Sequence, residues 1–204
     1  VAAANRVGTE NGQAFYGTSF ISDHTGEILG DFDRKQEGVV IATVDDLCLS
    51  HIHNFSLFDG IKSRRPDFRL VAFAIGNYQN KELLAESDEF LSWFSQHREW
   101  VEIGVHSYDH LPPPDGDRAD ERYWIEKALE SLRPFLPNEY SYRSPGWQTT
   151  YRTIPILCEL GFRYVFYESK VRDLQEECIV ETRVVNSHLY DLESIKRIER
   201  MMTT

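Results

Sequence analysis

Two histidines, four residues apart, stand at the end of a predicted strand. His106 and His110 follow the alternating run 100–105, which is typical of a half-buried strand. Two neutral imidazole nitrogens can hold one divalent metal and leave room for a carboxylate and a water. The spacing therefore predicts a metal site, although one H-x-x-x-H pair also arises by chance in a chain with seven histidines.

Two adjacent carboxylates end a second predicted strand, the buried run 39–44. Asp plus two His with one open position is the donor set of a hydrolytic metal site, so we expect Asp46 to join His106 and His110 as a ligand. Asp45 then points elsewhere, since successive strand side chains face opposite ways. It is better placed as the general base that takes a proton from the water. The alternative is that both Asp residues simply end the strand as turn residues.

Arg143 and His188 also come directly after predicted strands. Arg143 is able to keep the Asp45 carboxylate ionised and oriented through a forked pair of hydrogen bonds. A surface salt bridge is the simpler alternative. His188 titrates near neutral pH, which suits a general acid that protonates a leaving nitrogen, unless it is merely a histidine at a strand end.

Two aromatic residues, Tyr108 and Trp147, lie within the same groups of residues. Their flat apolar faces suit the walls of a sugar-binding site. Packing in the core or at the rim is the alternative for each. His51 and His53 are expected in a loop near the mouth of the site, while His97 is expected on a solvated helix face.

Strand-like and helix-like segments alternate from residue 39 onward. This alternation is typical of a parallel sheet, open or closed into a barrel, in which the side chains that follow the strands gather at one mouth. The expected strands are 39–44, 70–75, 100–105, 139–142, 162–167 and 182–185, the expected helices 54–64, 82–96, 122–132, 152–160 and 193–202, and an irregular loop is expected at 112–116.

Residues 1–38 have a different rhythm, with many Gly, Asn and Asp turn signals. Two short strand-like runs, 14–21 and 27–29, flank Asp23–Gly26, which suits a hairpin turn because Gly26 accepts a positive φ. We therefore expect two units, a β-hairpin extension over 1–38 and a catalytic domain over 39–204.

The composition is that of a globular chain: 204 residues, 41% hydrophobic and 13% aromatic. A formal net charge of -11 argues against nucleic acid or an anionic membrane surface as partner. The three cysteines are widely spaced, which favours reduced thiols in a cytoplasm. There is no membrane-spanning run and no signal-peptide pattern at the front, so we expect a cytoplasmic protein; the oligomeric state stays open.

Taken as an ordered set, Thr43–Asp46, His106–His110 and Arg143–Trp147 resemble the first three motifs of the polysaccharide deacetylases, the NodB-homology carbohydrate esterases. The resemblance covers about residues 39–190. It implies an α/β fold, an incomplete or irregular (β/α) barrel. It also implies a metal-dependent hydrolase that removes an N-acetyl group from a sugar.

The same resemblance implies a role for each matching residue. Asp45 matches the family's base, Arg143 the arginine that steadies it, and His188 the late histidine that acts as general acid. The metal triad is matched by Asp46, His106 and His110. Zinc is the expected metal, with cobalt and nickel as alternatives for an Asp-His-His set.

The chain departs from the family pattern in three places. Leu47 stands where the first motif usually has Gly, and Val44 where an aromatic residue is common. The stretch from Arg143 to His188 is short, which predicts that a strand–helix unit is missing. Asp173 and Asp191 are the candidates for the acidic partner of His188.

A second resemblance concerns the front of the chain. Residues 3–8, 15–21 and 38–42 resemble the C-terminal end of a nitrilase-type carbon–nitrogen hydrolase, of the N-carbamoylputrescine amidase sort. It covers about residues 1–45. That family works with a Glu, a Lys and a Cys upstream of this segment, and no residue here matches them.

Three hypotheses follow. The first is a metal-dependent deacetylase that acts on an N-acetylated carbohydrate or a related small amide, which is its expected partner. The second is a fragment of a carbon–nitrogen hydrolase without its catalytic residues. The third is a catalytically silent carbohydrate-binding domain. The altered first motif and the short stretch from Arg143 to His188 favour this hypothesis.

Overall fold

The computed structural model describes residues 39–110, 121–168, 170–180 and 182–203, together with five strands before residue 39. Those five strands are β1 (Ala2–Ala3), β2 (Val7–Glu10), β3 (Gln13–Tyr16), β4 (Phe20–Ser22) and β5 (Ile28–Asp31). The expected loop at 112–116 lies outside the described residues.

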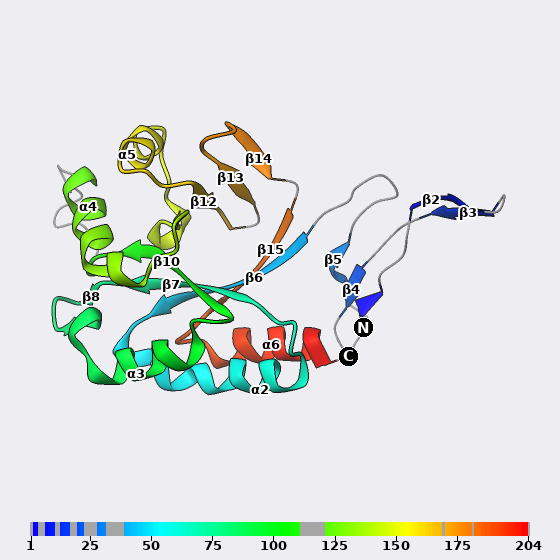
Figure 1. Ribbon diagram of the computed structural model, residues 1–204, viewed down its shortest axis with the longest axis horizontal. Coiled ribbons are helices and arrows are strands. Elements are labelled where there is room, and N and C mark those ends of the chain that lie inside the picture. Colours follow the sequence, from blue (N-terminus) through cyan, green and yellow to red (C-terminus); the bar gives the residue numbers. More distant parts are fainter. Residues whose placement is uncertain are drawn as a thin grey trace.

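The centre of the molecule is a curled sheet of eight strands (Figure 1). Its order is β14-β13-β12-β11-β10-β7-β6-β15, and all neighbours are parallel except the pairs β12–β13 and β13–β14. Because β14 and β15 end the order without pairing to each other, the barrel is incomplete, as expected. The strands are β6 (Val39–Leu47), β7 (Leu70–Ile75), β10 (Val101–Ser107), β11 (Ser141–Tyr142), β12 (Tyr164–Phe166), β13 (Val171–Asp173), β14 (Cys178–Val180) and β15 (Thr182–His188).

Helices cover the convex face of the sheet, with α2, α3 and α6 side by side beneath it in Figure 1. Apolar side chains at helical spacing point from them into the main core, for example Phe58 and Ile61 of α2 and Phe90 of α3. The helices are α1 (Leu49–Ile52), α2 (Ser56–Arg64), α3 (Asp88–His97), α4 (Glu121–Leu132), α5 (Thr153–Glu159) and α6 (Leu192–Thr203). In the described part of the chain no helix is long and apolar enough to cross a bilayer.

A smaller core lies on the concave face of the sheet. Phe73 and Phe166 meet there edge to face at 5.1 Å, and Val171 packs beside them. Gly104 of β10 makes room for this packing, because a Cβ at that position would lie 2.5 Å from the Phe73 ring. The candidate site sits above this core, at the carboxyl ends of the strands.

Most predicted elements after residue 39 are found, but His51 lies in α1 and His53 in a 3-10 turn rather than in a loop. The helix expected from residue 82 begins only at Asp88, where the Ser87 hydroxyl accepts a hydrogen bond from the Phe90 amide as an N-cap, and 82–86 form β9 (Glu82–Leu83) and a 3-10 turn (Leu84–Glu86) instead. The β13–β14 hairpin was not predicted. His97 is buried rather than solvated, because its ring stacks on Trp93 and contacts the Asp59 carboxylate at 2.8 Å.

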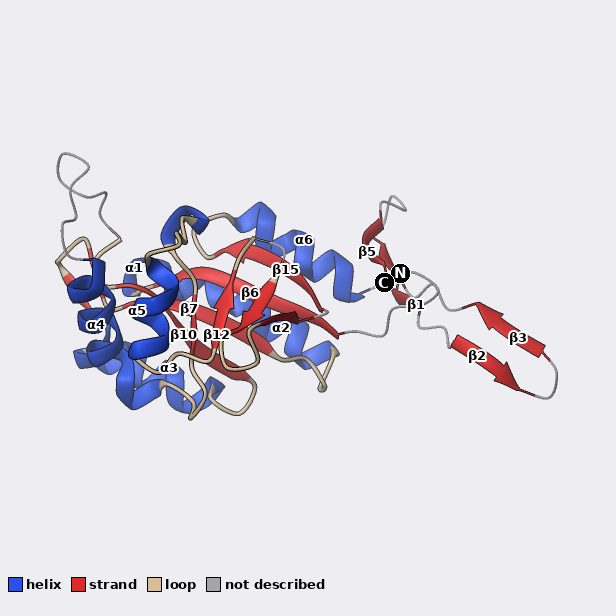
Figure 2. Ribbon diagram, turned by 90° about the horizontal axis from the view of Figure 1, so that it is seen from above, coloured by secondary structure: helices blue, strands red, loops and turns tan. Residues whose placement is uncertain are grey.

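The strands of the front segment pair only among themselves in the described part of the chain (Figure 2). β4 and β5 pair antiparallel, with Ile21 opposite Gly30. The turn expected at Asp23–Gly26 lies outside the described residues. The run expected as one strand over 14–21 is instead divided between β3, which pairs with β2, and β4.

Candidate metal centre

Both strands that carry the candidate ligands are irregular at the ligand itself. The pairing of β6 with β7 shifts register around Asp45 and Asp46, and the pairing of β10 with β7 shifts around His106. Asp46 has a φ of 67°, which is uncommon for a residue other than glycine. Bulges of this kind re-aim side chains beside functional sites.

The bulge overturns one expectation from strand alternation. Asp45 and Asp46 were expected to point in different directions. Instead both carboxylates reach the same histidine, since His188 Nδ1 lies 3.1 Å from Asp46 Oδ2 and 4.0 Å from Asp45 Oδ2. The extra residue in β6 and the positive φ of Asp46 turn the second carboxylate toward the first.

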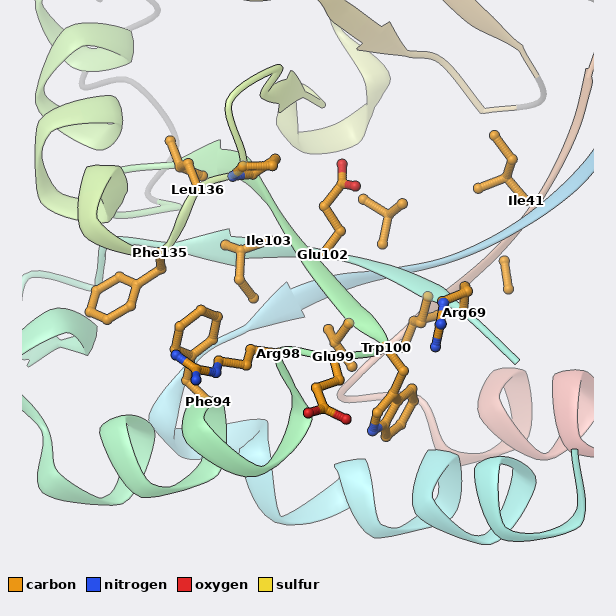
Figure 3. Close-up of a pocket in the computed structure, with 15 residues that line it drawn as sticks. Ile41, Arg69, Phe94, Arg98, Glu99, Trp100, Glu102, Ile103, Phe135 and Leu136 are labelled. Carbon is orange, nitrogen blue, oxygen red and sulfur yellow. The ribbon is translucent and has the colours of Figure 1, made fainter. Parts of the chain in front are cut away.

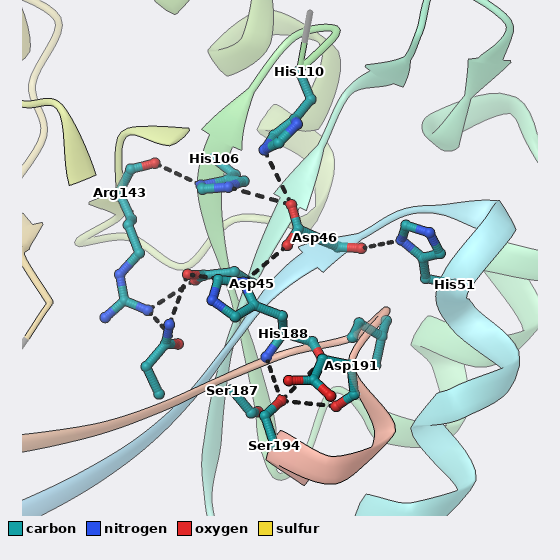
Figure 4. Close-up of polar contacts among 12 residues, drawn as sticks. Asp45, Asp46, His51, His106, His110, Arg143, Ser187, His188, Asp191 and Ser194 are labelled. Carbon is teal, nitrogen blue, oxygen red and sulfur yellow. Dashed lines mark hydrogen bonds and ion pairs between the residues drawn. The ribbon is translucent and has the colours of Figure 1, made fainter. Parts of the chain in front are cut away.

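Asp46, His106 and His110 come together at the mouth of the half-barrel (Figure 4). One ligand atom from each lies within 4.8 Å of the others. Asp46 Oδ1 is 3.1 Å from His110 Nε2 and 3.5 Å from His106 Nε2. Asp46 and His106 are buried, while His110 is partly exposed and leaves one side of the group open.

These distances fit a divalent cation between the three side chains. Two ligands at about 2.1 Å from a tetrahedral zinc lie about 3.4 Å apart, close to the spacing from Asp46 to each imidazole. His106 Nδ1 donates a hydrogen bond to the Arg143 carbonyl at 2.8 Å, so the neutral ring turns the lone pair of Nε2 toward the carboxylate. Without a cation, that lone pair would face an anionic oxygen.

The pKa shifts of Asp46 and His110 agree with this donor set. Burial by itself raises the pKa of Asp46, but the neighbouring His106, His188 and His110 together outweigh it and hold the pKa well below its usual value. Burial and the neighbouring His106 lower the pKa of His110. An ionised carboxylate and a neutral imidazole are the forms that bind a metal.

Asp45 is held beside this group by a fully buried arginine. Arg143 Nη1 donates to Asp45 Oδ1 at 2.8 Å, and neither side chain is more than 2% exposed. Burial lowers the pKa of Arg143, and the nearby Asp45 carboxylate opposes that shift. The guanidinium also lies 4.6 Å from the centre of the Phe73 ring. The structure thus brings together the pair that the sequence predicted, but through one hydrogen bond from Nη1 rather than the forked pair that was expected.

Asn186 of β15 completes the surroundings of Asp45, and sequence reasoning missed it. Its amide nitrogen donates to Asp45 Oδ2 at 2.9 Å, and its amide oxygen accepts from Arg143 Nη1 at 2.6 Å. The sequence feature that could have revealed Asn186 is its place two residues before His188, on the same face of the strand. No motif marked an amide at that position.

His188 lies on the other side of Asp46 from the two candidate histidine ligands (Figure 4). Its Nδ1 donates to Asp46 Oδ2 at 3.1 Å, which is the main reason that its pKa is raised. The two acidic partners suggested for it are wrong. Asp173 pairs with Arg163 at 2.8 Å, and the Asp191 carboxylate accepts from the Glu193 amide at the start of α6.

Aromatic rings border the mouth of the site. The two residues predicted to contact substrate, Trp147 and Tyr108, lie in different surroundings. The Trp147 ring lies 5.7 Å from that of His188, at the edge of the site. Tyr190 stacks on the same histidine at 5.2 Å and is exposed. Tyr108 instead lies against α4, with Lys127 Nζ 4.1 Å above its ring.

His51 also approaches the site. Its Nδ1 lies 3.3 Å from the Asp46 carbonyl and 3.3 Å from Cys48 Sγ. Cys48 is buried, and burial raises the pKa of its thiol to about 12, so it is neither a ligand nor a nucleophile at neutral pH. His53 is exposed and begins the 3-10 turn that follows α1.

A cavity of about 510 Å³ lies at the opposite ends of the strands (Figure 3). Ile41, Val71 and Glu102 line it from the amino-terminal halves of β6, β7 and β10. The candidate ligands follow at the carboxyl ends of the same strands. The cavity is therefore separate from the candidate metal centre.

Solved structures of a carbohydrate esterase and of a deacetylase are similar in fold to this chain. A family 4 carbohydrate esterase from Streptomyces lividans, in complex with acetate, matches with a TM-score of 0.58 over 81% of this chain and 86% of that one, at 14% identity. Most of the chain has the family 4 carbohydrate esterase fold. A deacetylase determined with substrate matches with a TM-score of 0.56 over 81% of this chain and 82% of that one, at 14% identity.

The same fold is also found in a protein described as a pseudoenzyme of this esterase family, from Bacillus anthracis. It matches with a TM-score of 0.59 over 82% of this chain and 60% of that one, at 12% identity. The fold resemblance predicted from the motifs is thus confirmed. The fold alone does not distinguish an active esterase from a silent one.

The second predicted resemblance is confirmed as well. Residues 1–50 match the carbon–nitrogen hydrolase family model. An N-carbamoylputrescine amidase from Arabidopsis thaliana is 41% identical over 78 residues, which are 34% of this chain and 25% of the relative. The chain thus spans a quarter of the length of that relative. The matched segment includes β6, the strand that ends in Asp45 and Asp46.

Proposed function

We propose that this protein is a metal-dependent hydrolase that removes an N-acetyl group from a sugar or a related small amide. The convergence of Asp46, His106 and His110 within 4.8 Å carries the proposal. The esterase fold and the buried Asp45–Arg143 pair beside the group support it. A deacetylase needs a Lewis acid, a base and an acid around one carbonyl carbon, and these residues supply that set.

The donor set suits zinc, and cobalt or nickel are alternatives. When bound, the metal would polarise the acyl carbonyl and lower the pKa of a coordinated water. Asp45, oriented by Arg143, takes the proton from the attacking water. His188, which lies on the opposite side of Asp46, returns a proton to the leaving nitrogen. Trp147 and Tyr190 offer flat faces beside His188 for a sugar ring.

Acetate release from N-acetylated chito-oligomers, with a generic acetyl ester as a second substrate, tests the proposal. We expect the zinc-loaded protein to release acetate. Asp45→Asn should abolish release while the metal content stays at the wild-type level, because Asp45 is not a ligand. Release that survives this substitution would remove Asp45 from the role of base.

A catalytically silent sugar-binding domain is the rival function, because one of the proteins with this fold is described as a pseudoenzyme. The two functions make opposite predictions for the same samples. Binding of chito-oligomers without acetate release from the zinc-loaded protein would favour the silent domain.

A further inference from the structure

Strand β15 places an amide side chain directly beside the proposed base. β15 pairs in parallel with β6, with Asn186 opposite Thr43 and His188 opposite Asp45. Because side chains two residues apart share a face, Asn186 and His188 both face the concave side of the sheet. Asn186 therefore lies on the side of Asp45 that is away from the metal-binding group.

Asn186 makes three hydrogen bonds around Asp45. Its Nδ2 donates to Asp45 Oδ2 at 2.9 Å. Its Oδ1 accepts from Arg143 Nη1 at 2.6 Å and from Thr43 Oγ1 at 2.8 Å. The amide thus bridges the base and its arginine, which come from strands at different places in the sheet.

The two donors reach different oxygens of the carboxylate. Arg143 holds Oδ1 at 2.8 Å and Asn186 holds Oδ2 at 2.9 Å. With one oxygen bound on each side, rotation about the last bond of Asp45 would break one of the two hydrogen bonds. A second lone pair on each oxygen stays available for a proton.

Charge explains why a neutral amide suits this position. Asp45 and Arg143 form a buried pair whose charges cancel. An Asp at position 186 would add a negative charge against the base, and an apolar residue would leave Oδ2 without this donor. Only a group with both a donor and an acceptor serves the two neighbours at once.

We propose that Asn186 is a positioning residue that orients the Asp45 carboxylate for proton transfer. It acts through Asp45 and does not touch the substrate. This inference rests on the proposed function, in which Asp45 is the base. A misplacement of a reacting group by about 1 Å can reduce a rate roughly 100-fold, so losing this donor should be costly to turnover.

Asn186→Asp is the first test, because it has the same shape and keeps an oxygen for Arg143 and Thr43. We expect kcat for acetate release from N-acetylated chito-oligomers to fall roughly 100-fold, with KM changed by no more than about twofold and zinc content unchanged. Asn54→Asp is the matched control. Asn54 Nδ2 donates to the Leu189 carbonyl just beyond β15, outside the site, so its loss tests a general loosening of this region.

Wild-type kcat in Asn186→Asp, or an equal loss in Asn54→Asp, would overturn the proposal. A swap of the two side chains gives a readout without turnover. In metal-free protein, Asn186→Asp should lower the thermal midpoint because two carboxylates then face each other. Adding Asp45→Asn should recover it, since the donor and the acceptor are exchanged and Arg143 keeps an anionic partner.

A double variant no more stable than Asn186→Asp alone would show that the two side chains do not interact, and would overturn the proposal. Recovery of the midpoint, with no recovery of acetate release, is the expected result, because the carboxylate has then left position 45. Since the swap is read from unfolding, it tests the contact even if the wild-type protein releases no acetate. If the wild-type protein releases no acetate, only the proposed function is refuted, and the inference about Asn186 is still tested by the swap.

Discussion

At the scale of single residues, the candidate metal ligands can be told apart from a nearby histidine by the effect of a metal on protein stability. Asp46, His106 and His110 turn their binding atoms toward one point, whereas His53 is exposed. A ligand that binds only the folded state stabilises it by RT ln(1 + [L]/Kd), about 2.7 kcal/mol at 100 times the Kd. Metal binding is therefore measurable without any substrate.

We expect zinc to raise the thermal midpoint of the wild-type protein and of His53→Ala, and to have little effect on His106→Ala. Elemental analysis after dialysis should find about one zinc per chain in the first two proteins and much less in the third. Equal zinc content in all three would mean that His106 is not a ligand.

The buried pair of Asp45 and Arg143 makes a second prediction at this scale. Removing one partner of a buried ion pair leaves an uncompensated charge and costs roughly 3–5 kcal/mol. Arg143→Ala should therefore lower the free energy of unfolding in urea by about that amount. Arg65→Ala breaks the exposed pair with Asp67, where solvent screens the charges, so we expect a much smaller loss than for Arg143→Ala.

The double variant Arg143→Ala with Asp45→Asn identifies the cause. If the orphaned carboxylate is what destabilises Arg143→Ala, neutralising it should recover part of the loss. A double variant that is less stable than Arg143→Ala would instead assign the loss to the packing of the arginine on Phe73.

At the scale of elements, the position of β10 depends on one glycine. A Cβ at Gly104 would lie 2.5 Å from the Phe73 ring and 2.8 Å from Ser141 Oγ, so the strand and the ring cannot both stay in place. Gly60 stands within α2, and a Cβ there would meet nothing nearer than Arg64 at 3.6 Å. The same substitution should therefore have opposite effects at the two positions.

Gly104→Ala should destabilise the protein by roughly 1–3 kcal/mol through overpacking. Gly60→Ala should stabilise it by roughly 0.5–1 kcal/mol, because alanine is the better helix former. Urea unfolding of both variants measures the difference. A neutral Gly104→Ala would mean that Phe73 can move without cost, and that it does not support Arg143 from below.

At the scale of the whole molecule, the described contacts of the candidate site all come from residues after 39. β1–β5 pair among themselves, and the eight-stranded sheet begins with β6. We therefore propose that residues 39–204 form the functional unit and 1–38 an extension of it. This division agrees with the different rhythm of the front of the sequence.

A chain that begins at residue 39 should fold, bind zinc with the wild-type stoichiometry and release acetate at a similar rate. Circular dichroism and metal analysis on the shortened protein check the first two. An unfolded or zinc-free product would show that the front segment is part of the unit that holds the site.

The sequence by itself determined which side chains stand at the ends of strands. Short apolar runs that alternate with helical patterns put Asp45, Asp46, His106 and Arg143 at the carboxyl ends of a parallel sheet, and such ends meet at one edge. These are local signals, because periodicity is set by neighbours in the chain. The order of three motifs then sufficed to predict the fold.

The tertiary structure decided what those side chains face. The bulge in β6 turned Asp46 against the strand alternation, and the register of β15 brought Asn186 and His188 to the two aspartates. The bulge depends on the pairing of β6 with β7, and the second arrangement on the pairing of β15 with β6, more than 100 residues away in the chain. No local pattern encodes either register. For the same reason Asp173, expected beside His188, lies instead against Arg163.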